Sequence, residues 1–205
     1  MSNYSNIMGK SKDIYLLMRV LAKVGWKTVR ETSLNRILYL SAVVYSFRYP
    51  DDNNIFQNNY RFTVTLSGPE DSDVDSALIN LVSNDLLVQV NEGYELSNMP
   101  INTAFLMSDE RKRCWFDDII YIIGVYGEDK IYDFIFRDPE YRTSLRSNTI
   151  YNLNIGTDNA TVKFLNSFKS AFEEKLKDKK DALNNRQYLE LYFEYIFGKI
   201  LRGEK

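Results

Sequence analysis

The chain has 205 residues, of which 44% are hydrophobic, enough to bury one ordinary core or two small, closely packed ones. It contains no histidine and a single cysteine, Cys114, which excludes histidine-dependent triads and an intrachain disulfide and argues against a zinc site. The formal net charge of −2 is unevenly spread, because residues 1–50 carry eight basic and two acidic side chains, whereas residues 51–110 carry one basic and eleven acidic side chains.

Two helices are predicted near the N-terminus. Ser11 precedes apolar residues at spacings of three and four, so residues 12–24 are expected to form an amphipathic helix with a basic outer face. A second helix is expected from Leu34, with Thr32 or Ser33 as its cap, and it is apolar around most of its circumference. We therefore expect this second helix to lie in the core.

The next part of the chain predicts a strand, a helix and a hairpin. Residues 61–66 (RFTVTL) alternate as a short strand, which the segment SGPED breaks. Ser72 and Asp75 resemble a capping box at the start of a helix, and VQV and YELS are expected to form two short strands around a turn at Gly93. This is the order of a winged helix, so residues 1–100 are predicted to form an N-terminal helix plus a winged-helix-like domain.

Residues 101–205 are predicted to form a helical domain. Ser108 is expected to cap a nearly continuously apolar helix that Gly127 ends. Four further helices are expected: 128–137, 139–147, one capped by Asp158, and one from about Arg186 to Leu201. The predicted fold class is therefore mainly α with a small β-wing, a winged-helix-like N-terminal half followed by a helical C-terminal half.

The sequence carries no motif for catalysis or for a cofactor. Neither phosphate-binding loop pattern, G-x-x-x-x-G-K-[ST] or G-x-G-x-x-G, occurs. The run from Asp71 to Asp75 imitates the start of a calcium loop, but Ser76 stands where that loop requires glycine. We therefore expect a protein that is not an enzyme and needs no metal or cofactor.

The sequence also predicts a cytoplasmic protein. The N-terminus lacks an apolar segment followed by a cleavage site, and no stretch of about 18 residues is free of charge. Cys114 is expected to be a buried, inert thiol, because its neighbours in a predicted helix are apolar.

Two sets of residues are candidates for partner contacts. The predicted third helix, from about Asp73 to Asp85, carries three Asp and no Lys or Arg, which is the wrong charge for DNA phosphates. Contacts with DNA or with an acidic partner are therefore expected from five basic residues: Lys10, Lys12, Lys23, Lys27 and Arg30. The basic segment from Lys175 to Lys180 is the other possible source of a DNA contact. Contacts with another protein chain are expected from the exposed sides of three tyrosines: Tyr188, Tyr192 and Tyr195. Solvated faces and core packing are the respective alternatives.

Several patterns in the chain point to a known family. From Leu34 to Ser97 they are LNRILYLSAVVYSF, RFTVTL, SGPEDSDVDSALINLVSNDLL and VQVNEGYELS. This segment resembles the winged-helix half of the middle component of three-component ABC-ATPase systems, among them the small subunit of Lamassu-like anti-phage defence. The downstream run IIYIIGVYGEDKIYDFIFRDPEYRTSL looks like the helical half of the same family.

The resemblance implies a noncatalytic accessory subunit of an SMC-like ATPase complex. Such a subunit bridges the ATPase dimer and a nuclease-type effector, and it helps to keep the effector inactive until foreign DNA is sensed. The alternative is a winged-helix DNA-binding regulator or antitoxin, because a related pattern of helix, Gly-Pro and wing occurs in a broad antitoxin-like family. An unrecognised metal-dependent nuclease is the remaining alternative.

Overall fold

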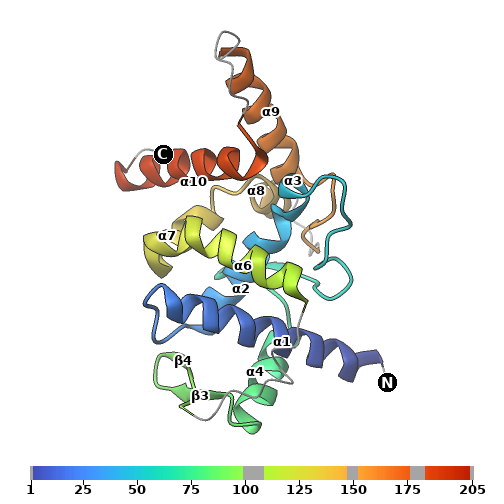
Figure 1. Cartoon of the computed structure of the whole chain (residues 1–205), viewed down its shortest axis with the longest axis vertical. Helices are drawn as coiled ribbons and strands as arrows, with labels where there is room; N and C mark the ends of the chain where they lie inside the picture. The colour runs from blue at the N-terminus through green and yellow to red at the C-terminus, as the bar shows by residue number, and fades with distance from the viewer. Residues whose placement is uncertain (1, 99–108, 147–151, 176–182, 204–205) are drawn as a thin grey trace.

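The computed structural model describes residues 2–98, 109–146, 152–175 and 183–203. The described chain is mainly helical, and its strands form two small antiparallel pairs (Figure 1). The expected mainly helical class is therefore confirmed for these residues.

The first helix, α1, spans Ser2–Lys23 and begins well before the predicted residue 12. Ser11 lies inside it and is not its cap. The Ser11 hydroxyl donates to the Ile7 carbonyl oxygen one turn earlier and accepts from the side-chain amide of Asn80. A serine whose hydroxyl is bonded to the preceding turn is tolerated within a helix.

Helix α2 spans Glu31–Val43 and is buried along most of its length, as predicted for the core helix. Its start differs from the prediction, because neither Thr32 nor Ser33 caps it and Arg30 occupies the N-cap position. A single further turn, α3 (Tyr45–Arg48), follows α2.

The segment SGPED does not simply end a strand; it supplies half of a hairpin. Strand β1 (Thr63–Thr65) pairs antiparallel with β2 (Gly68–Glu70). The turn between them is held by a residue distant in sequence: the Arg36 guanidinium of α2 donates to the Ser67 carbonyl oxygen at 3.1 and 2.6 Å. Since this contact is tertiary, local sequence patterns do not reveal it.

Helix α4 spans Asp73–Ser83, close to the predicted position, but the expected capping box is wrong. Ser72 makes no side-chain cap. Instead, the carboxylate of Asp71 accepts a hydrogen bond from the backbone N–H of Asp73 at 3.0 Å.

The second hairpin, β3 (Leu87–Val90) and β4 (Gly93–Leu96), is the predicted one. The free edge of β4 pairs with the segment between α1 and α2, where Val29 and Tyr94 exchange two backbone hydrogen bonds of 3.0 and 2.9 Å. This close approach requires Gly93, because a Cβ there would overlap the Val29 carbonyl oxygen.

The described residues of the C-terminal half are mostly helical, as predicted. Its elements are α6 (Glu110–Ile123), the 3-10 turn η1 (Gly124–Tyr126), α7 (Gly127–Ile135), α8 (Pro139–Arg146), α9 (Ala160–Lys175) and α10 (Asn185–Leu201). The predicted cap Ser108 lies outside the described residues, and Gly127 begins α7 instead of ending α6. The side chain of Asn159, and not that of Asp158, accepts from the Val162 N–H at the start of α9.

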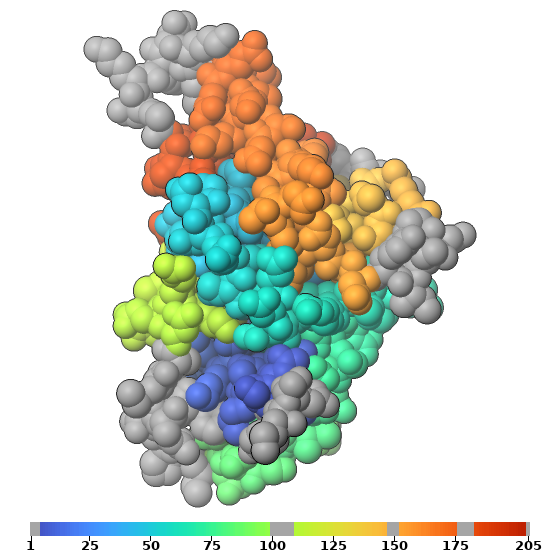
Figure 2. Space-filling view, turned by 90° about the vertical axis from the view of Figure 1, so that its right-hand side faces the viewer, coloured from blue at the N-terminus to red at the C-terminus, as the bar shows by residue number. Residues whose placement is uncertain are grey.

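One hydrophobic cluster runs through both halves of the chain. Helix α1 contacts α4 and α6, and α2 contacts α6 and α7. Figure 1 shows α4 and the second hairpin at one end of the molecule, with α9 and α10 at the other. In the space-filling view the blue α1 segment likewise lies between the green hairpin and the cyan and orange segments (Figure 2). The domain boundary predicted at residue 100 falls outside the described residues.

Within the part of the chain that the structure describes, no helix combines the length and the apolar character needed to cross a bilayer.

Candidate functional site

Lys10 lies inside the molecule and not on a basic surface. Its side chain is 1% exposed, and its ammonium nitrogen lies 2.5 Å from Asp71 Oδ1 and 2.9 Å from Asp73 Oδ2. The basic and acidic blocks of the sequence therefore neutralise each other here. The prediction that Lys10 contacts DNA or an acidic partner is wrong in this structure, because a buried and paired cation presents no face to a partner.

The four other basic residues have separate surroundings. Lys23 forms an exposed ion pair with Asp117 of α6 at 3.0 Å, and Arg30 pairs with two acids at the start of α7. Exposed pairs of this kind contribute little to stability, so both side chains remain available to a partner. Lys12 is half-buried and Lys27 is exposed.

Two of the three predicted interface tyrosines belong to the core. Tyr188 and Tyr192 are each 1% exposed, so the prediction that they meet another chain is corrected. Burial follows from the aromatic surroundings, since the Tyr192 ring lies within 6.0 Å of the rings of Phe134, Phe164 and Phe168. Tyr195 is exposed and remains a candidate contact.

Helix α4 presents an acidic and partly apolar outer face. Its inner face, including Val74 and Leu78, is buried against α1, while Asp75 and Ile79 point outward and Ile79 is 58% exposed. Val88 on the adjoining strand β3 is also exposed. The outer face therefore combines apolar area with negative charge.

Acidic side chains from neighbouring elements extend this face. Burial raises the pKa of Glu31 at the start of α2, and the carboxylates of Asp75 and Glu70 raise it further. The three carboxylates therefore share one region of negative potential.

Asp138 is the most deeply placed carboxylate outside the ion pairs, and its contacts are structural. It accepts hydrogen bonds from the hydroxyls of Tyr39 and Thr161, both at 2.6 Å, and from the Tyr141 N–H at 3.0 Å. Its side chain is fully buried and burial raises its pKa. Through these hydrogen bonds Asp138 joins α2, α8 and α9. Among the described residues, no three Cys, Asp or Glu side chains are grouped as a metal site.

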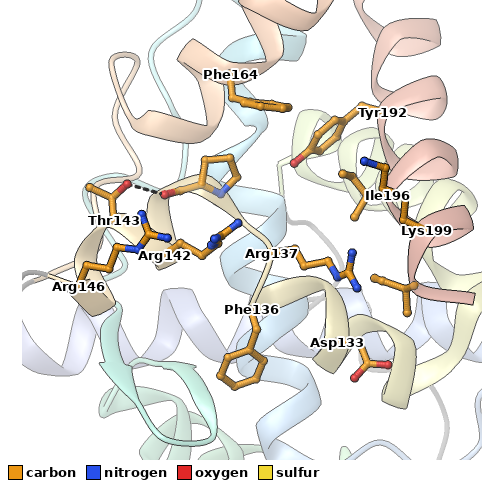
Figure 3. Close-up of a pocket in the computed structure, with 12 residues that line it drawn as sticks. Asp133, Phe136, Arg137, Arg142, Thr143, Arg146, Phe164, Tyr192, Ile196 and Lys199 are labelled. Atoms are coloured by element: carbon orange, nitrogen blue, oxygen red, sulfur yellow. Dashed lines mark hydrogen bonds between the residues drawn. The ribbon is translucent and has the colours of Figure 1, made fainter. Parts of the chain in front are cut away.

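A pocket of about 900 Å³ lies between α7, α8, α9 and α10 (Figure 3). Its lining brings together four cations, one acid and several apolar side chains: Arg137, Arg142, Arg146, Lys199, Asp133, Phe136, Phe164, Tyr192, Ile196 and Ile200. Tyr192, predicted as an interface residue, thus lines this pocket from α10.

The cationic residues of this pocket are not among the contact residues predicted from the sequence. Arg142 and Arg146 are four residues apart in the predicted helix 139–147, so the sequence does place them on one helical face. Lys199 is distant in sequence, and only the packing of α10 beside α8 brings it to the same pocket.

No family model, curated protein or solved structure matches this chain.

Proposed function

We propose that this chain is a noncatalytic subunit that binds another protein through the outer face of α4 and strand β3. The observation that carries the proposal is the character of that face, on which Ile79 and Val88 are exposed beside acidic side chains. Exposed apolar side chains surrounded by charge are typical of protein contacts.

The order of elements supports the hypothesis that this part of the chain is a winged helix. Helix α1, the segment at Val29, helix α2, helix α4 and the hairpin β3–β4 come in this order, with α3 and the hairpin β1–β2 between α2 and α4. Val29 pairs with Tyr94 at the edge of the second hairpin. Under this hypothesis α4 corresponds to the helix that enters the DNA major groove in DNA-binding winged helices. Its negative charge opposes phosphate, so the partner that fits α4 is a protein with a basic and apolar surface.

The wider role that we propose is that of an accessory subunit in an SMC-like ATPase anti-phage complex in the cytoplasm. In that complex the chain bridges the ATPase and a nuclease-type effector. The resemblance of residues 34–97 to such subunits motivates this part of the proposal. A DNA-binding regulator is the second candidate, favoured by the exposed residue Lys27.

Co-expression tests the proposal directly. The chain is produced together with a large ATPase and an effector encoded beside its gene, and copurification is measured. The double variant Ile79→Asp with Val88→Asp is expected to lose the partner, whereas Val125→Asp, on an exposed side chain of η1, is expected to keep it. Loss of the partner with Val125→Asp alone, or copurification unaffected by the double variant, contradicts the proposed face.

The regulator alternative predicts a different result. The purified chain would then bind its own promoter much more tightly than random duplex, by roughly a thousandfold or more, and a Lys27→Glu variant would lose that binding. Equal binding to both duplexes rules this alternative out.

A further inference from the structure

The pocket between α8 and α10 has the size and chemistry of a ligand site that the proposed docking face does not use. Its volume of about 900 Å³ lies within the range of small-molecule sites, about 300–1,000 Å³. It lies on the half of the molecule away from α4 and the second hairpin (Figure 1). The two regions are therefore separable by mutation.

Positive charge dominates the pocket. Four cationic side chains and one carboxylate, Asp133, line it, and Asp133 also lies 3.4 Å from Lys130. Arg142 and Arg146 are exposed, and neither guanidinium has an ion-pair or hydrogen-bond partner among the described residues. Guanidinium groups bind phosphate with two parallel hydrogen bonds, so this wall suits a ligand with several negative charges.

The pocket also has apolar and aromatic surface. Figure 3 shows the Phe164 ring facing the pocket from α9, with Ile196 of α10 on the far side. Phe164 is 45% exposed, and an inorganic anion would leave that surface in water. A planar ring stacked on Phe164 would cover it.

Tyr192 lines the pocket from α10. Tyr192 is 1% exposed, and Figure 3 shows its hydroxyl directed toward the pocket from the side of α10. Burial holds the pKa of Tyr192 well above its usual range, so the hydroxyl stays protonated and can donate to a ligand.

We propose that this pocket binds a nucleoside polyphosphate. The phosphates lie against Arg142 and Arg146, the base lies on Phe164, and the Tyr192 hydroxyl donates to a polar atom of the ligand. A free nucleotide is favoured over a nucleic-acid strand because the pocket has the volume of a small-molecule site.

Isothermal titration calorimetry of the full chain with ATP, AMP, pyrophosphate and a single-stranded oligothymidylate tests this inference. ATP is expected to bind at least tenfold more tightly than AMP, which lacks most of the charge, and than pyrophosphate, which lacks the base. No heat with millimolar ATP overturns the inference. Equal affinity for ATP and pyrophosphate reveals a site for anions alone and overturns it too, as does tighter binding of the oligonucleotide than of ATP.

Variants assign the binding to this pocket. The double variant Arg142→Ala with Arg146→Ala is expected to weaken ATP binding by tenfold or more. Tyr192→Phe keeps the buried ring and removes only the hydroxyl, so it is expected to weaken ATP binding several-fold with little change in thermal unfolding. The charge-matched control, Lys12→Ala with Lys27→Ala, is expected to bind as the wild type does. ATP binding that survives the arginine variant, or that the control abolishes, places the ligand elsewhere and overturns the inference.

Discussion

Lys10 and Asp71 are 61 positions apart in sequence, and their charged groups meet inside the molecule with Nζ and Oδ1 2.5 Å apart. The carboxylate of Asp71 also accepts from the backbone N–H groups of Arg61 and Asp73. The pair therefore joins α1 to the start of α4 and to the first hairpin. The Lys10 ammonium and the Asp71 carboxylate are both buried, so each needs the other to compensate its charge.

Replacement of Lys10 by methionine is expected to lower the free energy of unfolding by about 3–5 kcal/mol, because the Asp71 carboxylate is left buried without its cation. Urea denaturation measures the loss. The matched control is Lys27→Met, an exposed position, for which a change within about 0.5 kcal/mol is expected. Equal losses for the two variants would show that Lys10 is not buried as an ion pair.

Asp138 makes stability depend on pH. Burial raises its pKa in the folded state above the ordinary value of 3.8, so its contribution to stability is fully present below pH 3.8 and is lost as the pH rises through the folded-state pKa. Asp138→Asn cannot titrate. The stability of the wild type relative to Asp138→Asn is therefore expected to decrease from acid toward neutral pH.

Urea denaturation of both proteins over a pH series checks this expectation. The comparison cancels the titration of all other groups that the two proteins share. A wild-type advantage that grows toward neutral pH would mean that the hydrogen bonds from Tyr39 and Thr161 outweigh burial and lower the pKa.

Gly93 permits the close pairing of Val29 with Tyr94. Gly93→Ala is expected to destabilise the protein by about 1–3 kcal/mol, because the added Cβ displaces the Val29 carbonyl. Gly198→Ala is the control, and it is expected to increase the stability of the protein. The added Cβ only approaches the Arg202 side chain, at 3.5 Å, and alanine is favoured over glycine within a helix by roughly 0.5–1 kcal/mol. Thermal unfolding of both variants distinguishes the two effects, and a neutral Gly93→Ala would contradict the pairing.

Cys114 is exposed on α6, which corrects the expectation of a buried thiol. One thiol per chain is therefore expected to react with an aromatic disulfide reagent in the native state, at a rate similar to that in urea. The released thiolate is followed by absorbance, and a Cys114→Ser chain is the blank. Protection in the native state that urea removes would contradict this exposure.

Several local features were predictable from sequence because they depend on contacts close in the chain. Hydrophobic spacing gives the helices around Leu34 and Trp115, and turn chemistry gives the hairpin at Gly93. Helix starts were less predictable. Asp71 and Asn159 replace the predicted caps Ser72 and Asp158, since neighbouring polar residues compete for the same backbone N–H groups and the tertiary packing selects one of them.

The candidate surfaces likewise include features that the sequence predicts and features that depend on tertiary packing. The acidic character of α4, the lack of histidine chemistry and the mainly helical class follow from the amino-acid sequence, because charge, composition and helical periodicity are properties of the residues themselves. The burial of the Lys10 ion pair, the exposure of Cys114 and the meeting of Arg142 with Lys199 in one pocket follow from the packing of the helices. Those outcomes depend on which helices pack together, and the spacing within a single segment carries no information about the side chains that a distant segment brings to it.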